Sequence, residues 1–178
     1  MAETSFDVLR SLIRDVPDHP EPGIVFKDIT PLLADAAGLS SMIAAMAAPW
    51  RDTEIDLVLG LEARGFILGA PVAAALGAGF VPARKAGRLP RATLQESYGL
   101  EYGVDTIEVH VDAVAAGARV LVIDDVLATG GTASAAGRLL DRLEADLVGF
   151  GFLIELAFLD GRAALGDARV ERLVAVED

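Results

Sequence analysis

Two adjacent acids and the glycine turn that follows them are the residues of this chain best suited to chemistry. Asp124 and Asp125 stand in the segment Val120–Ser134 (VLVIDDVLATGGTAS), and the turn Ala128–Thr132 follows two residues later. Carboxylates accept strongly from hydroxyls and also suit a magnesium ion. Two glycines let an anion approach the main chain, and a helix starting there offers unpaired N–H groups. The segment therefore predicts a site for hydroxyls or magnesium at one end and for a phosphate at the other.

The residues around this motif predict the elements that hold it. Val120–Ile123 is a fully apolar run, which fits an interior strand of a parallel sheet. After the turn, Ala136, Leu139, Leu140 and Leu143 recur at helical spacing. In parallel sheets ligands bind just beyond the carboxyl ends of the strands, which is where the acids and the turn fall.

Two better-known glycine motifs do not match. A Walker loop requires G-x-x-x-x-G-K-[ST], but Gly60 and Gly65 are followed by phenylalanine and isoleucine. Neither G-x-G sequence, at residues 77–79 or 149–151, continues to the third glycine of a dinucleotide fingerprint. The segment resembles instead the phosphoribosyl-pyrophosphate (PRPP) motif of the type I phosphoribosyltransferases. The alternative is an ordinary strand–turn–helix whose aspartates cap the turn, although capping needs one acid rather than two.

Length, charge and cysteine content narrow the class of protein. The chain has 178 residues, no cysteine and a formal net charge of −12, and we expect one domain over residues 1–178. The acidic balance argues against nucleic-acid binding, and the absence of a long apolar stretch or a signal pattern argues for the cytoplasm rather than a membrane. The exception is Pro82–Thr93, with four basic residues and no acid. Such a stretch suits a small polyanion.

Strands that alternate with helices predict an α/β fold with a mainly parallel sheet. Helical spacing is expected over residues 6–16, and over residues 31–50 with a break near Gly38. The predicted strands are 56–61, 79–83, 106–111, 119–123, 147–154 and 169–176. Alternation over Thr106–Val111 predicts a wet face that carries Glu108 and His110. Between Gly87 and Val104 no apolar period is found, so we expect a long mobile lid loop.

Three further segments extend the resemblance to one family. They are FKDITPLL (Phe26–Leu33), GLEARGFILG (Gly60–Gly69) and the stretch Arg84–Gly103, which begins RKAGRLP and ends LEYG. Together with the PRPP motif they resemble the adenine phosphoribosyltransferase family over about Pro22–Ile154. The resemblance implies the type I fold with a flexible lid and a small hood. It also implies a glycosyltransferase of purine salvage that makes AMP and pyrophosphate from adenine and PRPP. Magnesium would be bound to PRPP, with no direct protein ligand, and the assembly would be a homodimer.

The same resemblance assigns the PRPP-binding residues. For the phosphate and ribose of PRPP or AMP they are Asp124, Asp125, Ala128, Thr129, Gly130, Gly131 and Thr132. For pyrophosphate they are Ala63, Arg64, Arg84, Lys85 and Arg88, of which some reach across the dimer in the family. Glu62 is assigned no chemistry.

Around the base, Phe26 matches the aromatic residue that stacks on the purine. The Val25 carbonyl suits the 6-amino group of adenine, and the Lys27 N–H suits N1. Hypoxanthine reverses both groups and would be rejected. Glu101 matches the lid carboxylate that handles the purine proton as a general acid–base. Tyr98 and Tyr102 are expected to seal the lid against water.

Two rival functions remain open at this stage. The base could be another purine or a pyrimidine, although the FKDITP and LEYG segments favour adenine. Alternatively, the chain could bind PRPP as a regulator without catalysis. A regulator usually needs a nucleic-acid surface or an added domain, against which the acidic charge and the retained Glu101 both argue.

Overall fold

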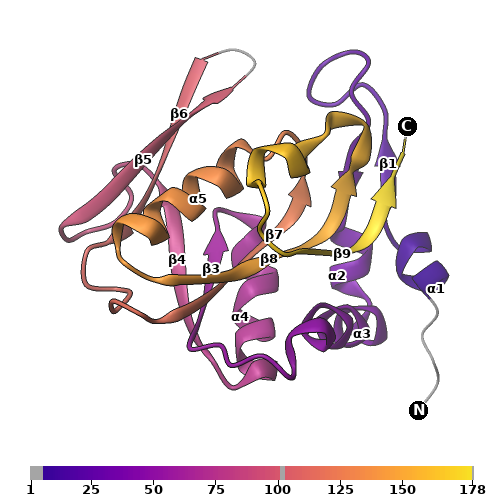
Figure 1. Cartoon of the computed structure of the whole chain (residues 1–178). Helices are drawn as coiled ribbons and strands as arrows, with labels where there is room; N and C mark the ends of the chain where they lie inside the picture. Colours follow the sequence, from indigo (N-terminus) through magenta and orange to yellow (C-terminus); the bar gives the residue numbers. More distant parts are fainter. Residues whose placement is uncertain (1–5, 101–102, 178) are drawn as a thin grey trace. The chain divides into compact units, whose positions relative to one another are not determined.

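The computed structural model describes residues 6–100 and 103–177 (Figure 1). The chain divides into two compact units, one up to Ala45 and one from Met46 onward. Among the described residues no helix is long and apolar enough to cross a membrane.

The first unit holds a small two-stranded sheet and short helices. Its elements are α1 (Phe6–Ser11), β1 (Arg14–Val16), β2 (Phe26–Asp28), α2 (Thr30–Ala34) and the start of α3 (Ala36–Ala47). Strands β1 and β2 are antiparallel, with Val16 opposite Phe26.

Two helix boundaries predicted in the first unit are wrong. The first helix ends at Ser11, and Val16 belongs to β1 instead. In the second predicted helix, over residues 31–50, the break falls at Asp35 rather than near Gly38. The reason is a cap: Asp35 Oδ1 accepts from the Gly38 N–H at 2.6 Å, which starts a new helix at Ala36.

A seven-stranded mixed sheet forms the centre of the second unit (Figure 1). Its strands are β3 (Leu57–Leu61), β4 (Gly79–Lys85), β5 (Thr93–Leu100), β6 (Gly103–His110), β7 (Arg119–Leu127), β8 (Asp146–Leu156) and β9 (Val170–Val176). They lie in the order β5-β6-β4-β3-β7-β8-β9. The five strands from β4 to β9 are parallel, and β6 and β5 are antiparallel additions at the edge.

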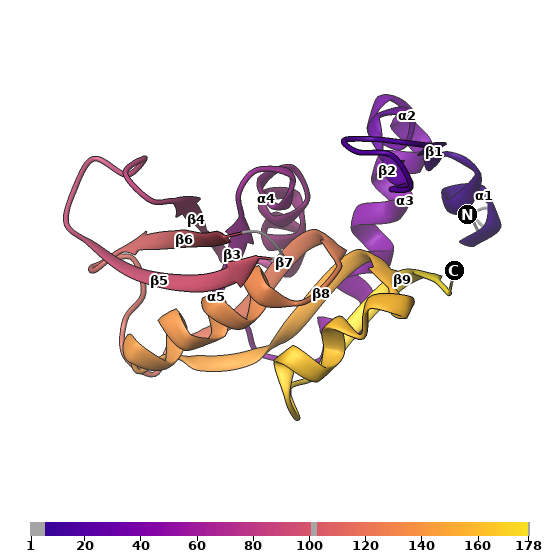
Figure 2. The same cartoon turned by 90° about the horizontal axis from the view of Figure 1, so that it is seen from above.

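Helices α4 (Arg64–Leu76) and α5 (Gly131–Arg142) lie on opposite faces of this sheet (Figure 2). The short turns η1 (Ala48–Trp50), η2 (Ala157–Leu159) and η3 (Gly161–Leu165) complete the unit. Because β7 is covered on both faces, all of Val120–Ile123 is fully buried. The predicted α/β fold with an interior β7 is confirmed.

The predicted absence of structure between Gly87 and Val104 is wrong over Thr93–Leu100, which forms β5. This strand pairs with β6 from Thr93 opposite His110 to Leu100 opposite Gly103. Helix α5 also fixes it, because Glu96 accepts from Arg138 Nε at 2.7 Å and Arg142 Nη1 at 3.0 Å. Such long-range pairs leave no apolar period in the sequence.

The prediction of a wet face on β6 is wrong at Glu108, although Asp112, at the end of the same alternation, is exposed. Glu108 is only 1% exposed and accepts from several donors of the loop between β4 and β5 and of β5 itself. The Nε2 atom of His110 is likewise buried. Glu108 therefore lies buried beneath the loop and binds its main chain.

Helix α5 allows a direct test of the packing. A Cβ added at Gly137 would lie 3.6 Å from Phe150 Cζ and 3.7 Å from Leu147 Cδ2, which is ordinary contact. Because alanine also loses less entropy in a helix, Gly137→Ala should raise the free energy of unfolding by about 0.5–1 kcal/mol in urea titrations.

The matched variant is Gly161→Ala, whose Cβ would lie 2.1 Å from the Ala128 carbonyl oxygen. This variant should lose stability. A loss for Gly137→Ala as well would contradict the space found between α5 and β8.

Candidate active site

The carboxyl end of β7 and the start of α5 form an open cavity of about 70 Å³. Its lining includes Asp124 and the whole turn from Ala128 to Thr132. The remaining lining residues are Val126, Leu127, Ala133 and Phe152. The structure therefore brings six of the seven residues assigned to the PRPP phosphate and ribose to one cavity.

The turn owes its shape to Gly130 and to its close packing on η3. Gly130 has a φ of +80°, a conformation that favours glycine. A Cβ on Gly130 would lie 2.4 Å from the Gly161 carbonyl oxygen, so no side chain fits there. The first N–H groups of α5 have no partners within the helix. They give this end of the cavity donors for an anion.

The two aspartates have different surroundings. Asp124 lines the cavity and its Oδ1 accepts from the Asp125 N–H at 2.9 Å. Asp125 is 4% exposed, and its Oδ2 forms an ion pair with Arg64 Nε at 2.5 Å. Burial and the neighbouring carboxylate of Asp125 raise the pKa of Asp124 well above its ordinary range. Burial also raises the pKa of Asp125, although Arg64 opposes this shift.

The loop between β3 and α4 brings Ala63 and Arg64 to the aspartates. Helix α4 begins at Arg64, and the Glu62–Ala63 peptide that precedes it is cis. A Cβ on Gly65 would lie 2.8 Å from the Ile123 carbonyl oxygen and 3.0 Å from Asp124 Oδ1. The glycine therefore lets the start of α4 pack directly against the end of β7.

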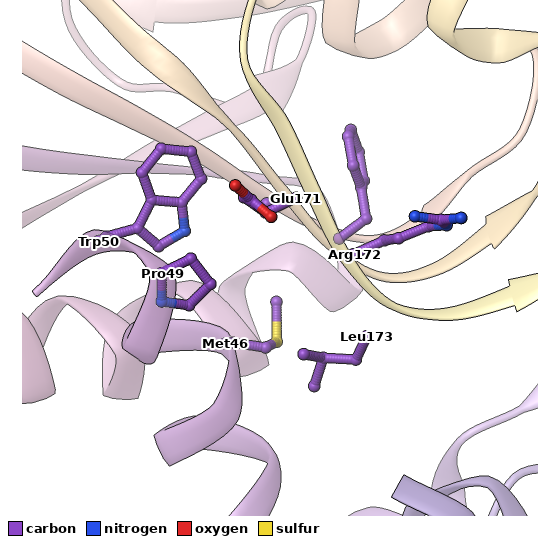
Figure 3. Close-up of a pocket in the computed structure, with 8 residues that line it drawn as sticks. Met46, Pro49, Trp50, Glu171, Arg172 and Leu173 are labelled. Carbon is purple, nitrogen blue, oxygen red and sulfur yellow. The ribbon is translucent and has the colours of Figure 1, made fainter.

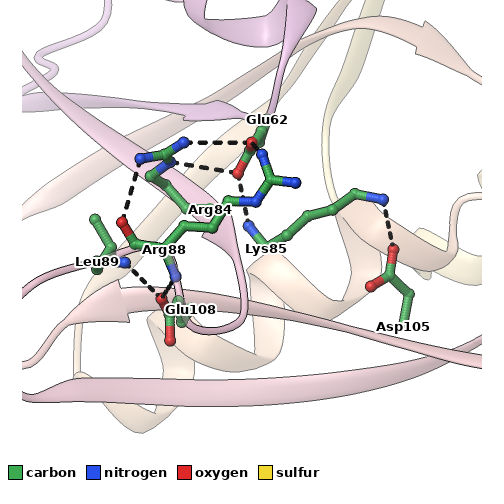
Figure 4. A network of polar contacts seen from close by, with 7 residues as sticks. All are labelled: Glu62, Arg84, Lys85, Arg88, Leu89, Asp105 and Glu108. Carbon is green, nitrogen blue, oxygen red and sulfur yellow. Dashed lines mark hydrogen bonds and ion pairs between the residues drawn. The ribbon is translucent and has the colours of Figure 1, made fainter.

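Glu62 binds basic residues at the end of β4 and in the loop that follows it (Figure 4). Its carboxylate accepts from Arg84 Nε at 3.3 Å, Lys85 N–H at 2.8 Å and Arg88 Nη1 at 2.7 Å. Burial raises the pKa of Glu62, but these donors outweigh burial and the pKa is lowered overall. The sequence indicated no role for Glu62, and the structure makes it the common partner of two arginines assigned to pyrophosphate.

Two acids of β6 complete this arrangement. Asp105 Oδ2 lies 3.0 Å from Lys85 Nζ. Glu108 Oε1 accepts from the N–H groups of Arg88 and Leu89 at 2.9 Å each (Figure 4). Burial raises the pKa of Glu108, but the bonds from Leu89 and other donors lower it to about 2. The sequence analysis assigned neither acid a role in the site.

Tyr98 is buried against the turn at the start of α5 and does not lie in an exposed loop. It is 8% exposed, and its hydroxyl donates to Asp105 Oδ2 at 3.2 Å. A Cβ on Gly131 would lie 3.2 Å from Tyr98 Cδ2, so β5 packs closely on the turn at the start of α5. Glu101 and Tyr102 lie outside the described residues.

The residues assigned to adenine lie in the first unit. Phe26 begins β2, and the His19 ring meets its ring edge-on with centroids 5.2 Å apart. Lys27 Nζ forms an ion pair with Asp15 Oδ1 at 2.8 Å, and Val25 is exposed.

A second, smaller cavity lies beside Trp50 (Figure 3). Met46, Pro49 and Leu173 give it mainly apolar walls. The charged residues near it are paired: Glu171 with Arg169, and Arg172 with Glu155. Arg169 also lies 4.3 Å from the centre of the Trp50 ring. The charged residues beside this cavity are therefore engaged in contacts with one another and with Trp50.

Among the described residues, no group of three or more His, Asp or Glu side chains is arranged to hold a metal ion.

Comparisons with known proteins agree on one family. Residues 27–169 match the model of the phosphoribosyl transferase domain. The adenine phosphoribosyltransferase of Myxococcus xanthus (strain DK1622) is 58% identical over 166 residues, covering 93% of this chain and 90% of that protein.

Solved structures give the same result. The adenine phosphoribosyltransferase of Thermoanaerobacter pseudethanolicus superposes with a TM-score of 0.95 at 45% identity, over 97% of this chain and 100% of that chain. The Saccharomyces cerevisiae enzyme, solved with adenine and an imino-altritol bisphosphate, gives a TM-score of 0.90 at 40% identity, over 94% and 97%.

Buried Glu108 predicts a pH-dependent contribution to stability. Its pKa of about 2 lies below the ordinary 4.5, so the contribution is complete above pH 4.5 and is lost as the pH falls toward 2. Glu108→Gln should cost about 3 kcal/mol of unfolding free energy at pH 7, and the difference from the parent should shrink below pH 4.5. Exposed Glu144→Gln is the control. Equal costs for the two variants in urea unfolding would refute the role of Glu108.

For Asp124 we expect the opposite dependence of stability on pH. Its raised pKa means that its stabilising contribution is complete below the ordinary carboxyl pKa and is lost as the pH rises through the raised value. Asp124→Asn keeps an acceptor for the Asp125 N–H but removes the buried charge. Its melting temperature at pH 7 should exceed the parent's by a few degrees, and the gain should fade in acid. Exposed Asp141→Asn on α5 should show no such gain. A lower melting temperature for Asp124→Asn would contradict the destabilising effect assigned to the Asp124 charge.

Proposed function

The chain belongs to the phosphoribosyl transferase domain family and, within it, to the adenine phosphoribosyltransferases, and from this we propose that it converts adenine and PRPP to AMP and pyrophosphate. The observation that carries the proposal is the single cavity that Asp124 and the turn Ala128–Thr132 line together. A phosphorylated ribose needs both of the groups that meet there: anion-binding N–H groups and a carboxylate for hydroxyls.

In the proposed complex the 5′-phosphate occupies the turn at the start of α5. The N–H groups there and the hydroxyls of Thr129 and Thr132 bind its oxygens, and the positive end of the helix favours its charge. The ribose hydroxyls donate to Asp124, with Asp125 and Arg64 behind it. These bonds satisfy an ionised carboxylate that burial otherwise disfavours, so substrate binding recovers the cost of keeping Asp124 charged.

Pyrophosphate is assigned to the N–H groups of Ala63 and Arg64 and to the basic side chains of Arg84, Lys85 and Arg88. The last three are paired with Glu62 or Asp105 in the structure. Pyrophosphate therefore binds by exchange with carboxylates that already hold these cations. Magnesium bound to PRPP neutralises part of the charge of the leaving pyrophosphate. The metal is assigned to the substrate, with no direct protein ligand.

The reaction passes through positive charge at C1′ as the bond to pyrophosphate lengthens. The anionic Asp124–Asp125 pair beside the ribose favours that charge. The residues at the pyrophosphate end favour departure, because they stabilise the developing negative charge. Glu101 is assigned the purine proton as a general acid–base, a role worth about 10²–10⁴ in rate.

Selection of the base is assigned to Val25, Phe26 and Lys27. Phe26 stacks on the purine, the Val25 carbonyl accepts from the 6-amino group, and the Lys27 N–H donates to N1. A site built for this pair of bonds rejects hypoxanthine, because its buried groups would be left unpaired. The proposal also includes a homodimer, a cytoplasmic location and a role in purine salvage, with Tyr98 and Tyr102 closing the site.

The test is to incubate the protein with magnesium, PRPP and one of adenine, hypoxanthine, guanine or orotate, and to measure nucleotide and pyrophosphate. Adenine alone should give product. Asp124→Asn should weaken PRPP binding by about 10- to 100-fold, since a hydrogen bond to a charged group is lost. Asp141→Asn should leave binding unchanged. Product from another base would overturn the assignment of the base site, and PRPP binding without any product would indicate a regulator.

A further inference from the structure

The backbone of η3 supports the turn Ala128–Thr132. A Cβ on Gly130 would lie 2.4 Å from the Gly161 carbonyl oxygen and 2.9 Å from Ala164 Cβ. In the other direction, a Cβ on Gly161 would lie 2.1 Å from the Ala128 carbonyl oxygen. The two main chains are therefore in direct contact, with no side chain between them. Because close-packed groups have little room to absorb a displacement, a shift of η3 is passed on to the turn.

A buried acid in turn fixes η3. Glu155 of β8 pairs in register with Leu127, the last residue of β7 before the turn, and its side chain is only 6% exposed. Its carboxylate accepts from Arg162 Nε at 2.6 Å and from Arg162 Nη2 at 3.1 Å. The remaining nitrogen, Nη1, donates to the Val170 carbonyl at 3.3 Å. All three nitrogen atoms of the Arg162 guanidinium are thus bonded, and they tie η3 to β8 and β9.

We propose that Glu155 and Arg162 are positioning residues for the 5′-phosphate, which hold the N–H groups of the turn in place through the backbone of η3. The inference rests on the proposed function, because that function places the phosphate in the turn. The two residues act without touching the ligand. Main-chain N–H groups bind an anion well only when several of them converge on it, so a small displacement of the turn weakens them together.

The ion pair suits this role because of its geometry and its burial. Two hydrogen bonds join the two oxygens of Glu155 to one guanidinium, which restrains the orientation of Arg162 as well as its distance. An exposed ion pair would hold η3 only loosely, because water and salt compete with such pairs. The buried carboxylate of Glu155 is shielded from that competition, so Arg162 and the backbone that carries it are held in one position.

Arg172 offers an internal comparison. Its Nε lies 2.5 Å from Glu155 Oε2, so the same carboxylate holds two arginines. Arg172 belongs to β9, where it pairs in register with Phe152 of β8. Arg162, by contrast, directly follows Gly161 within η3. Of the two ion pairs that Glu155 makes, the one with Arg162 is therefore the one that leads to the turn.

The experiment compares Arg162→Gln with its matched control, Arg172→Gln, by calorimetry with ribose 5-phosphate and, separately, with magnesium pyrophosphate. Each variant removes one arginine from Glu155, and the two side chains are similarly exposed, at 41% and 38%. Arg162→Gln should weaken ribose 5-phosphate binding by about tenfold, the scale of one hydrogen bond to a charged group. It should leave magnesium pyrophosphate binding unchanged. Arg172→Gln should leave both affinities unchanged, and Glu155→Gln should show the same selective loss as Arg162→Gln.

Arg162→Lys is the milder variant if Arg162→Gln does not fold. It keeps a positive charge for Glu155 but loses the paired donors, so its loss of ribose 5-phosphate affinity should be smaller and equally selective. Unchanged ribose 5-phosphate binding in the Arg162 variants would overturn the positioning role. So would an equal loss in Arg172→Gln, or an equal loss of affinity for both ligands. A parent that binds neither ligand would refute the proposed function itself, and the positioning role with it.

Discussion

Largely buried carboxylates fix the cations assigned to pyrophosphate, and the rest of the site depends on this pairing. Glu62 holds Arg84 and Arg88, Asp105 holds Lys85, and Asp125 holds Arg64. A guanidinium or ammonium near the surface is mobile unless a partner restrains it, and a buried carboxylate is costly unless donors surround it. Each group therefore meets the need of the other, which explains how a chain with a net charge of −12 keeps a concentrated set of cations in place.

Asp124 is the exception among these acids, because its environment works against its charge. Burial and the adjacent Asp125 both raise its pKa, and the Arg64 ion pair is made by Asp125 instead. A carboxylate held in this state gains more from hydroxyl donors than a solvated one would. The Asp124 charge lowers the stability of the folded protein, and the hydroxyl donors of the proposed ligand offset this loss when it binds. Stability and binding thus place opposite demands on one residue.

The β5–β6 hairpin, which includes most of the assigned lid, packs against the start of α5. Arg138 and Arg142 of α5 hold Glu96, and Tyr98 packs on the turn from which α5 starts. Glu108 beneath the loop orders the main chain at Arg88 and Leu89. The hairpin is therefore tied both to α5 and to the basic end of β4.

The sequence by itself determined the local chemistry of this protein: the acid pair and glycine turn after an apolar run, the order of strands and helices, and the family. These features depend on residues close together in the chain, whose spacing reveals a buried strand or a helix start. Only the tertiary structure decided that residues 93–100 form a strand, that Glu108 is buried, and that Glu62, Asp105 and Asp125 hold the cations. Those contacts join residues such as Glu96 and Arg138, 42 positions apart. They depend on which strands become neighbours in the sheet, and no periodicity along the chain records that.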